Sequence, residues 1–195
     1  MDSDGVTLRF KRSFDLSISV VAAIILAIPI AALALLVKLS SRGPVFYWSD
    51  RVGINNCIFK MPKFRSMRLG APAVATHLLA NADLWLTPVG SFLRKSSLDE
   101  LPQLWSIIKG DMSFVGPRPA LFNQYDLIAQ RTEHGVHKLI PGLTGWAQIN
   151  GRDELPIPQK VALDVEYLNR RSFFLDIRIM LSTALKVIKR DNVTH

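Results

Sequence analysis

The stretch LSISVVAAIILAIPIAALALLV, residues 16–37, is a run of 22 residues without a single charge. At about 1.5 Å per residue, one helix of this length reaches across the hydrocarbon core of a bilayer. The sequence therefore predicts insertion into a membrane. A cleaved signal peptide is the alternative, but the run is long for the apolar part of such a peptide. Lys38 and the SSR of residues 40–42 also follow it in place of a small-x-small cleavage site.

Pro29 lies near the middle of this run, where it removes a helical hydrogen bond and bends the helix. Basic residues flank both ends, with Lys11 and Arg12 before the run and Lys38 and Arg42 after it. A true span is expected to have an asymmetric distribution of positive charge, so charge on both flanks favours a bent hairpin that returns to the cytoplasmic face. Kinked spanning helices are common as well, and the sequence weighs the two topologies about evenly.

The anchor is expected to occupy residues 1–42, and residues 43–195 have the composition of one globular domain. Lys and Arg outnumber Asp and Glu by 24 to 16, and the net charge of +8 implies an anionic partner: nucleic acid, anionic lipid or a phosphorylated substrate. Cys57 is the only cysteine, and no Cys/His pattern has zinc-ligand spacing.

Short-range patterns in the second part predict both strands and helices. Strand-forming residues at 44–48 and 57–64, around the turn-like residues 52–56, predict a hairpin. The Ala-rich segment 70–81 is expected to be a loop with a short helix. Apolar residues at helical spacing between 101 and 108, followed by a Lys-Gly pair, predict a helix with a glycine cap.

A second amphipathic pattern covers residues 174–188. Its apolar stripe consists of Phe174, Ile177, Leu181, Ala184, Leu185 and Ile188. Basic residues on or beside the opposite face are typical of a helix lying on an anionic membrane, and a core-packing helix with a basic outer face has the same pattern. The expected fold is mixed, mainly α with a small β-sheet, with an N-terminal re-entrant membrane helix hairpin and amphipathic interfacial helices.

Two adjacent carboxylates, Asp99 and Glu100, lie in the segment SSLDELPQ, residues 96–103. Ser97 and Glu100 have the S-x-x-E spacing of a capping box, and acids in a first helical turn commonly do no more than stabilise the helix. Taken alone, the segment predicts a helix start more strongly than an active site. Pro102 leaves the first residue of the helix open by one or two positions.

Basic residues downstream and upstream of this segment favour phosphate binding. Prolines on both sides of Arg118 restrict its backbone and reduce the freedom lost when it holds a ligand, and arginine suits bidentate contact with phosphate. The alternative is a rigid turn with a solvated arginine. A second basic cluster consists of Lys60, Lys63 and Arg65, with Lys63 and Arg65 on one face of the predicted strand.

A glycine-rich stretch, PGLTGW at 141–146, leads into NGR at 150–152 and offers backbone donors, an aromatic ring and Arg152 to a phosphate and a nucleobase. Each of these stretches is weak evidence by itself. His134 and His137 lie in a polar connecting stretch and are interpreted as solvated bystanders. Asp164 and Tyr167, on the helix expected after Pro158, are positional candidates for lining the site.

Seven ordered motifs together resemble the bacterial sugar transferase family, the monotopic polyprenyl-phosphate phosphoglycosyl transferases. They are KRSFD (11–15), FKMPKFRSM (59–67), SLDELPQ (97–103), KGDMS (109–113), GPRP (116–119), PGLTGW (141–146) and NGR (150–152). The likeness runs from about Lys11 to Arg190. The length resembles that of the small members that initiate glycans with modified amino sugars.

The resemblance implies that Asp99 attacks the β-phosphorus of a UDP-sugar, which gives an aspartyl phosphosugar and UMP, and that polyprenyl phosphate then accepts the sugar phosphate. It implies Mg²⁺ as the cofactor, held by Asp99 and Glu100, while a role of Glu100 as a proton acceptor stays open. The implied location is the bacterial inner membrane, with the catalytic domain on the cytoplasmic face and a homodimer possible. The substrate-binding residues carried over by the motifs are Lys60, Lys63, Arg65, Arg118, Thr144, Gly145, Trp146 and Arg152.

Two positions depart from the family pattern: Ile28 precedes Pro29 where relatives often have Ser, and Asp153 stands where relatives commonly have Asn. Two non-enzymatic functions also remain open. One is a basic membrane-surface binding protein whose carboxylates only cap a helix. The other is a nucleic-acid binder, which the charge favours, although no such motif is present and the uncharged run favours lipid.

Overall fold

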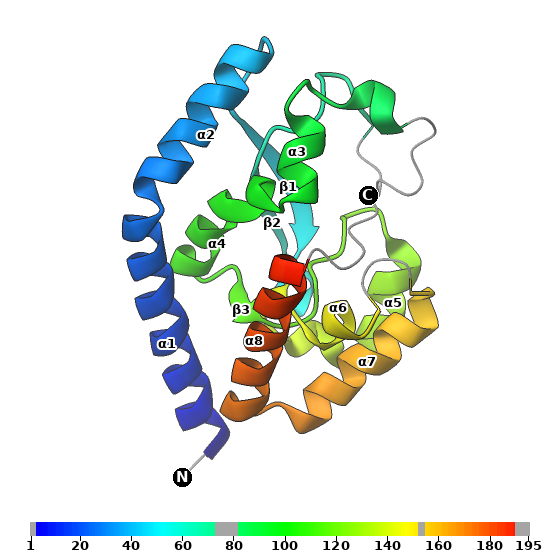
Figure 1. Ribbon diagram of the computed structural model, residues 1–195. Coiled ribbons are helices and arrows are strands. Elements are labelled where there is room, and N and C mark those ends of the chain that lie inside the picture. Colours follow the sequence, from blue (N-terminus) through cyan, green and yellow to red (C-terminus); the bar gives the residue numbers. More distant parts are fainter. Residues whose placement is uncertain (1–2, 73–81, 152–154, 190–195) are drawn as a thin grey trace.

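The computed structural model describes residues 3–72, 82–151 and 155–189, and shows a mixed, mostly helical fold with two small sheets (Figure 1). Two N-terminal helices, α1 (Ser3–Ile25) and α2 (Ala27–Ser40), run along one side of the other elements. The expected fold class, mixed and mainly α with a small β-sheet component, is confirmed. Most of the segment 70–81, where a loop with a short helix was expected, lies outside the described residues.

The axes of α1 and α2 differ in direction by 63° across a break at Leu26. Pro29 is the third residue of α2, and a proline ring collides with the carbonyl of the residue four positions earlier, here Ile25. The helix therefore breaks before the proline, and it does so with Ile28 in place of a serine. Within the described residues, neither helix alone is long and apolar enough to cross a bilayer, whereas the bent pair has the required length and composition.

The predicted hairpin is present and consists of β1 (Phe46–Val52) and β2 (Ile58–Phe64), which pair antiparallel. The first strand continues four residues beyond the expected Trp48, and the chain turns through the short 3-10 helix η1 (Ile54–Asn56). Since side chains alternate along a strand, Lys60 and Lys63 point to opposite faces of β2. The buried side of the hairpin carries Met61, which packs against Leu104 and Ile107.

The helix predicted over residues 101–108 is divided in two. A 3-10 helix, η4 (Leu98–Gln103), precedes the α-helix α4 (Leu104–Lys109). Pro102, inside η4, has no N–H to donate to an α-helical bond. Gly110 ends α4 in a left-handed conformation, φ +100°, as predicted.

The predicted capping box is wrong. Ser97 has a left-handed backbone, φ +56°, and its side chain caps nothing. Glu100 turns its carboxylate towards Lys63 and Arg118 instead of back to Ser97. The chain turns at Ser97 and continues as the 3-10 helix η4, which carries both carboxylates and packs against β2 of the hairpin.

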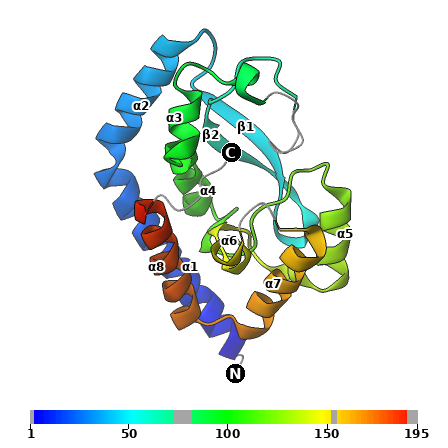
Figure 2. The ribbon, with the colours of Figure 1, turned by 45° about the vertical axis from the view of Figure 1, so that its right-hand side comes forward.

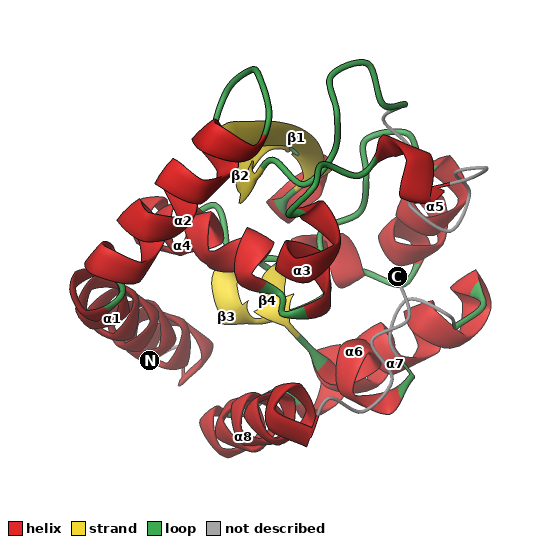
Figure 3. Cartoon of the chain, turned by 45° about the horizontal axis from the view of Figure 1, so that its top comes forward, coloured by secondary structure: helices red, strands yellow, loops and turns green. Residues whose placement is uncertain are grey.

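The remaining elements complete the fold around this segment. They are η3 (Ala82–Trp85), α3 (Gly90–Lys95), β3 (Ser113–Val115), α5 (Tyr125–Glu133), η5 (Val136–Lys138), β4 (Gly142–Thr144), α6 (Trp146–Asn150), α7 (Ile157–Arg170) and α8 (Phe173–Lys189). β3 and β4 form a parallel pair that lies apart from the hairpin (Figure 3).

The predicted amphipathic helix is confirmed as α8, whose first residue, Phe173, packs against Phe10 and Phe14 of α1, while the rest of the helix runs away from α1 (Figure 1). Figure 2 shows the same helices from another side. Ile179 is buried in the core, whereas Phe174, Leu181 and Leu185 are exposed. Part of the apolar stripe of α8 therefore stays exposed. A helix that served only to pack against the core would have this stripe buried.

The KRSFD motif fastens α1 to the rest of the chain. The Arg12 guanidinium donates to the carbonyl oxygens of Ile107 and Ile108, the latter at 2.7 Å, and so binds the last turn of α4. Lys11 forms an ion pair with Asp176 at the start of α8. Carbonyls at a helix C-terminus lack intrahelical donors, so a guanidinium from α1 completes the bonding of α4.

Replacing Arg12 with Gln is expected to lower the free energy of unfolding by about 1–3 kcal/mol, because two charge-assisted hydrogen bonds to backbone carbonyls are lost. Arg9→Gln is the matched control, since Arg9 is exposed on the same helix. Thermal unfolding of both variants in detergent measures the difference. An equal loss of stability in the two variants would contradict the fastening role of Arg12.

Candidate active site

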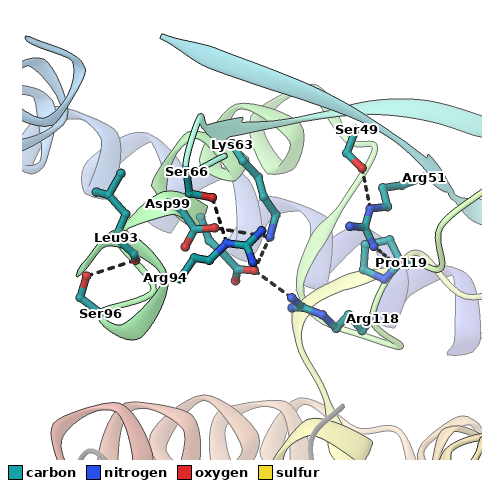
Figure 4. Close-up of polar contacts among 11 residues, drawn as sticks. Ser49, Arg51, Lys63, Ser66, Leu93, Arg94, Ser96, Asp99, Arg118 and Pro119 are labelled. Carbon is teal, nitrogen blue, oxygen red and sulfur yellow. Dashed lines mark hydrogen bonds and ion pairs between the residues drawn. The ribbon is translucent and has the colours of Figure 1, made fainter. Parts of the chain in front are cut away.

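Asp99 and Glu100, both in η4, lie where the hairpin and the loop after β3 meet (Figure 4). Lys63, from β2, places its Nζ 2.7 Å from Glu100 Oε1 and 3.8 Å from Asp99 Oδ2. Arg118 Nη2 lies 2.9 Å from the same Glu100 oxygen. Elements distant in sequence thus bring two cations to an adjacent pair of acids.

A further cation near Asp99 is Arg94, at the end of α3, which had no place among the predicted site residues. Arg94 Nε donates to Ser66 Oγ at 3.0 Å, and the positive charge of Arg94 acts on Asp99 (Figure 4). The left-handed Ser97 turns the chain between α3 and η4, so that Arg94 and Asp99 come together across it. No motif marks Arg94, and only the geometry of that turn could have identified it.

Burial and charge shift the pKa values of the two acids in opposite directions. Burial raises the pKa of Asp99 above its ordinary value, and the nearby Lys63 only partly offsets this. Burial also acts to raise the pKa of Glu100, but Arg118 and Lys63 outweigh it and hold that pKa well below its usual range. Glu100 is thus a fixed anion, whereas Asp99 is a desolvated carboxylate whose charge is not fully compensated.

Two members of the predicted basic cluster do not reach the carboxylates. Lys60 lies on the opposite face of β2 and forms an exposed ion pair with Asp50 at 2.7 Å. Arg65 is buried beyond the end of β2 and donates to the carbonyl oxygens of Ser41, at 2.8 Å, and Arg42. These carbonyls follow the last turn of α2, so Arg65 holds the chain where it leaves that helix.

The glycine-rich stretch lies directly against the loop that carries Arg118. A Cβ on Gly145 would lie 2.2 Å from the carbonyl oxygen of Gly116, so only glycine allows this approach. The Thr144 hydroxyl is buried against the Thr183 hydroxyl at 2.7 Å. The stretch therefore supports the Arg118 loop through its backbone. Arg152 lies outside the described residues.

Trp146, a predicted substrate contact, is held by residues of α7. Its Nε1 donates to Glu166 at 2.9 Å, and the Arg170 guanidinium lies 5.5 Å from its ring centroid. The structure does not place Trp146 in contact with the carboxylate pair in η4.

Asp164 and Tyr167, the two positional candidates, have structural contacts away from the carboxylate pair. Asp164 forms a buried ion pair with Arg131 at 2.6 Å, and Arg131 in turn donates to the carbonyl oxygen of Arg118 at 2.8 Å. The Tyr167 hydroxyl donates to Asp176 at 2.7 Å. These two residues do not line the carboxylate pair, but Asp164 acts on it at a distance by orienting the Arg118 loop.

The two histidines differ from each other. His134 is exposed, as predicted, and its Nδ1 lies 2.8 Å from the Gln130 carbonyl oxygen. His137, also expected to be solvated, is half-buried: its Nδ1 is covered and has no hydrogen-bond partner among the described residues. His137 lies on η5, which packs near the tip of the hairpin.

The donor set at η4 fits Mg²⁺ in only one way. The described residues contain no group of three or more metal-ligating side chains. Mg²⁺ is commonly held by one or two carboxylates together with substrate phosphates and waters. Asp99 and Glu100 could supply two carboxylates to such an ion, whose remaining ligands would be a phosphorylated substrate and water.

The carboxylates of Asp99 and Glu100 are thus surrounded by Lys63, Arg94 and Arg118, the side chains that commonly contact phosphate groups in proteins. The chain belongs to the bacterial sugar transferase family, whose model matches residues 6–190. The matched region contains all described residues of the site.

Several curated proteins are similar to this chain. The UDP-glucose:undecaprenyl-phosphate glucose-1-phosphate transferase of Escherichia coli is 40% identical over 190 residues, which cover 93% of this chain and 41% of the relative. The undecaprenyl-phosphate galactose phosphotransferase of Salmonella typhimurium is 35% identical over 196 residues, covering 93% and 41%. The exopolysaccharide production protein ExoY of Rhizobium meliloti is 39% identical over 189 residues, covering 89% and 83%.

The chain thus spans about two fifths of the first two relatives and most of the third. The names of the first two relatives carry different sugars, glucose and galactose. Membership of the family therefore leaves the sugar undefined.

The opposite pKa shifts predict opposite effects of two conservative substitutions on stability. Asp99→Asn is expected to raise the melting temperature at pH 7, since it removes a charge that burial disfavours. Glu100→Gln is expected to lower the free energy of unfolding by about 2 kcal/mol, since it breaks two partly buried, charge-assisted ion pairs.

The effect of Glu100→Gln is expected to depend on pH. The folded-state pKa of Glu100 is depressed, so its carboxylate contributes full stability above the unfolded-state value of about 4.5 and loses it as the pH falls further. The gap between wild type and Glu100→Gln should therefore narrow below pH 4.5. Thermal unfolding between pH 3 and 8 measures this, and a gap that stays constant over that range would contradict the ion-pair interpretation.

Proposed function

We propose that this protein is a phosphoglycosyl transferase that moves a sugar 1-phosphate from a UDP-sugar to polyprenyl (undecaprenyl) phosphate and releases UMP. This would be the first membrane step in the assembly of a glycoconjugate. The observation that carries the proposal is the buried Asp99 among three cations, Lys63, Arg94 and Arg118. The names of two relatives, which pair a sugar phosphate with undecaprenyl phosphate, support the choice of substrates.

In the first step an Asp99 carboxylate oxygen attacks the β-phosphorus of the donor. The bond between the β-phosphorus and the bridging oxygen breaks, UMP leaves with that oxygen, and an aspartyl phosphosugar forms. An anionic nucleophile that approaches a diphosphate needs its repulsion cancelled, and Lys63 and Arg118 supply positive charge at that place. Burial of Asp99 also leaves its carboxylate poorly solvated and so more reactive.

Asp99 and Glu100 would hold Mg²⁺ together with the donor diphosphate. When bound, this ion neutralises negative charge on the phosphates and so assists departure of UMP. Glu100 is suited to the role of ligand, because Arg118 and Lys63 keep it ionised at all working pH values. A low pKa makes it a weak proton acceptor.

In the second step an oxygen of the polyprenyl phosphate attacks the phosphorus of the aspartyl phosphosugar. The bond between phosphorus and the Asp99 oxygen breaks, the carboxylate is restored, and a diphosphate-linked sugar lipid leaves. One nucleophile thus serves two substrates that arrive separately, one from water and one from the membrane. No proton has to be moved in either step if the acceptor phosphate is ionised.

The proposal includes attachment to the cytoplasmic face of the bacterial inner membrane. The hairpin of α1 and α2, within residues 1–42, would enter the bilayer as a re-entrant anchor, and the catalytic domain of residues 43–195 would rest on the surface. Exposed isoleucines and leucines along the bent pair support this, among them Ile28 and Leu39. The exposed apolar stripe of α8 would lie at the same interface.

Incubation of the detergent-solubilised protein with UDP-sugars and Mg²⁺, without lipid acceptor, tests the chemistry. Intact mass spectrometry is expected to detect a sugar-phosphate adduct on the wild type and none on Asp99→Asn. Asp50→Asn is the matched control, since Asp50 forms its ion pair on the outer face of the hairpin, and it should form the adduct normally.

If the adduct persists in the Asp99→Asn variant, Asp99 is not the nucleophile. A protein that binds membranes and forms no adduct with any nucleotide sugar would instead support the alternative function, a basic membrane-surface binding protein. A panel of UDP-sugars in the same experiment identifies the donor.

Membrane attachment is tested by flotation with vesicles of phosphatidylethanolamine and phosphatidylglycerol. The double variant Ile24→Ser/Ile28→Ser is expected to lower the partition coefficient about a hundredfold or more, because each isoleucine that enters the bilayer contributes about 1.5–3 kcal/mol to transfer. Ile54→Ser/Ile58→Ser is the control, since these isoleucines are exposed at the hairpin tip. Equal losses in the two double variants would refute insertion through the bent pair.

A further inference from the structure

A ring of polar side chains joins α1 to β3, the strand that leads into the Arg118 loop. Its members, named here the buried ring, are Lys11 and Asp15 of α1, Tyr167 of α7 and Asp176 of α8. The two carboxylates and the tyrosine are each less than a tenth exposed. β3 contacts both α1 and α8 (Figure 3). The proposed mechanism gives none of these four residues a role.

One part of the buried ring reaches β3 by way of α8 and α7. Lys11 forms an ion pair with Asp176, and the Tyr167 hydroxyl donates to Asp176 Oδ1 at 2.7 Å. Tyr167 in turn lies against Val115, the last residue of β3, in the same apolar cluster. One side of the strand is therefore held by residues that are themselves tied to α1.

Asp15 holds the same strand directly. The neighbour of β3 in its sheet is β4, and Ser113 and Val115 are the residues in register with it. The amide between them, that of Phe114, donates to Asp15 Oδ1 at 3.4 Å. A backbone N–H that is shielded from water needs a partner, and here a carboxylate of α1 supplies it.

Stability alone does not account for two buried carboxylates at this place. Removing a carboxylate from water is costly, and a buried ion pair often contributes no more to stability than apolar side chains of similar volume. Hydrogen bonds and ion pairs are directional, however, so those of Asp15 and Asp176 form in only one placement of α1 against β3. The buried ring thus defines a geometry that apolar packing would leave less exact.

β3 passes this geometry on to Arg118 over three residues. The amide of Gly116 donates to the Thr144 carbonyl oxygen at 2.9 Å, and prolines on both sides of Arg118 restrict its backbone. A shift of Val115 would therefore displace Arg118, whose Nη2 lies 2.9 Å from Glu100 Oε1.

We propose that Asp15 is a positioning residue for the reaction: it fixes β3 from the membrane-anchor helix, and through β3 it holds Arg118 against Glu100. The other members of the buried ring hold the same strand from α7 and α8. Correct placement of the anchor helix against the catalytic domain is then a condition for a complete site. The catalytic consequence rests on the proposed function, in which Arg118 offsets the repulsion between Asp99 and the donor diphosphate.

A double-mutant cycle of thermal unfolding in detergent tests the link without any substrate. If Asp15 holds Arg118 against Glu100, the Asp15→Ala variant has already weakened that ion pair, while the pair of Glu100 with Lys63 remains. Glu100→Gln should then lower the melting temperature only about half as far in Asp15→Ala as in the wild type. Fully additive losses, as expected for independent sites, would overturn the inference.

Phe173→Leu is the matched control for this cycle. Phe173 packs against Phe10 and Phe14 at the same junction of α1 and α8, and it is not a member of the buried ring. The variant should lower the melting temperature, and its loss and that of Glu100→Gln should add. Coupling as strong as that of Asp15→Ala would mean that the buried ring only stabilises the junction.

Two further variants keep the cycle decisive if Asp15→Ala does not fold. Asp15→Asn keeps an oxygen that accepts from the Phe114 amide, so Glu100→Gln should cost nearly as much in it as in the wild type. Tyr167→Phe removes the hydrogen bond to Asp176 and keeps the aromatic ring, so it should reduce the effect of Glu100→Gln to a smaller extent than Asp15→Ala. Additive losses in Tyr167→Phe would also overturn the inference.

The rate of adduct formation measures the consequence for the reaction, with Mg²⁺ and the UDP-sugar that the donor panel identifies. In a single turnover, Asp15→Ala is expected to form the adduct about tenfold more slowly, because a misplaced group at a reacting centre commonly costs that much or more. Asp15→Asn should recover most of the rate, and Phe173→Leu should react as the wild type does.

The two experiments keep the inference apart from the proposed function. An unchanged adduct rate in Asp15→Ala, or equal slowing in Phe173→Leu, would refute the positioning role of Asp15 and leave the proposed function intact. Absence of an adduct from the wild type with every UDP-sugar would refute the proposed function, whereas the thermal cycle would still decide whether Asp15 holds Arg118 against Glu100.

Discussion

The ion pairs of Glu100 with Lys63 and Arg118 are the interaction on which the rest of the structure depends. They join β2, η4 and the loop after β3, and Lys63 adds a longer contact to Asp99 in the same segment. A buried carboxylate needs such partners, and once Glu100 has them the adjacent Asp99 is left with the weaker contact, at 3.8 Å from Lys63. The positive charge is therefore divided unequally between the two neighbours: Glu100 holds the three segments together, and Asp99 is left less fully paired, which suits the chemical role proposed for it.

The outer parts of the fold hold these three segments in place by separate means. Arg131 and its buried partner Asp164 fix the Arg118 carbonyl from α5 and α7, and the close approach of Gly145 to Gly116 fixes the same loop from the parallel strand pair. Arg12 closes α4 from the side of the N-terminal helices. The N-terminal helices therefore reach the carboxylate segment by two routes: through Arg12 and α4, and through the packing of α2 against Leu98 and Leu101 of η4.

Local patterns predicted the bent helix, the hairpin and the amphipathic α8, because each rests on periodicity or on a proline within a few residues. They failed at Ser97, where tertiary ion pairs of Glu100 override a capping box that has the correct spacing. They also placed Arg65 at the site and left out Arg94. The sequence does not show that Arg65 binds the carbonyl groups after α2, or that the turn at Ser97 brings Arg94 to Asp99. The proposal that Asp99 is the nucleophile came from the family resemblance, because the spacing alone favoured a capping turn.

The left-handed conformation of Ser97, two residues before Asp99, limits how this segment can evolve. A non-glycine residue at positive φ costs about 1–2 kcal/mol, and a β-branched side chain there is a severe outlier. Glycine, asparagine or aspartate could replace the serine with little cost, whereas valine, isoleucine or threonine would unwind the turn that brings Arg94 to Asp99. Selection at position 97 therefore acts on the backbone conformation. Few residue types should be tolerated there, although the serine side chain makes no capping hydrogen bond at the start of η4.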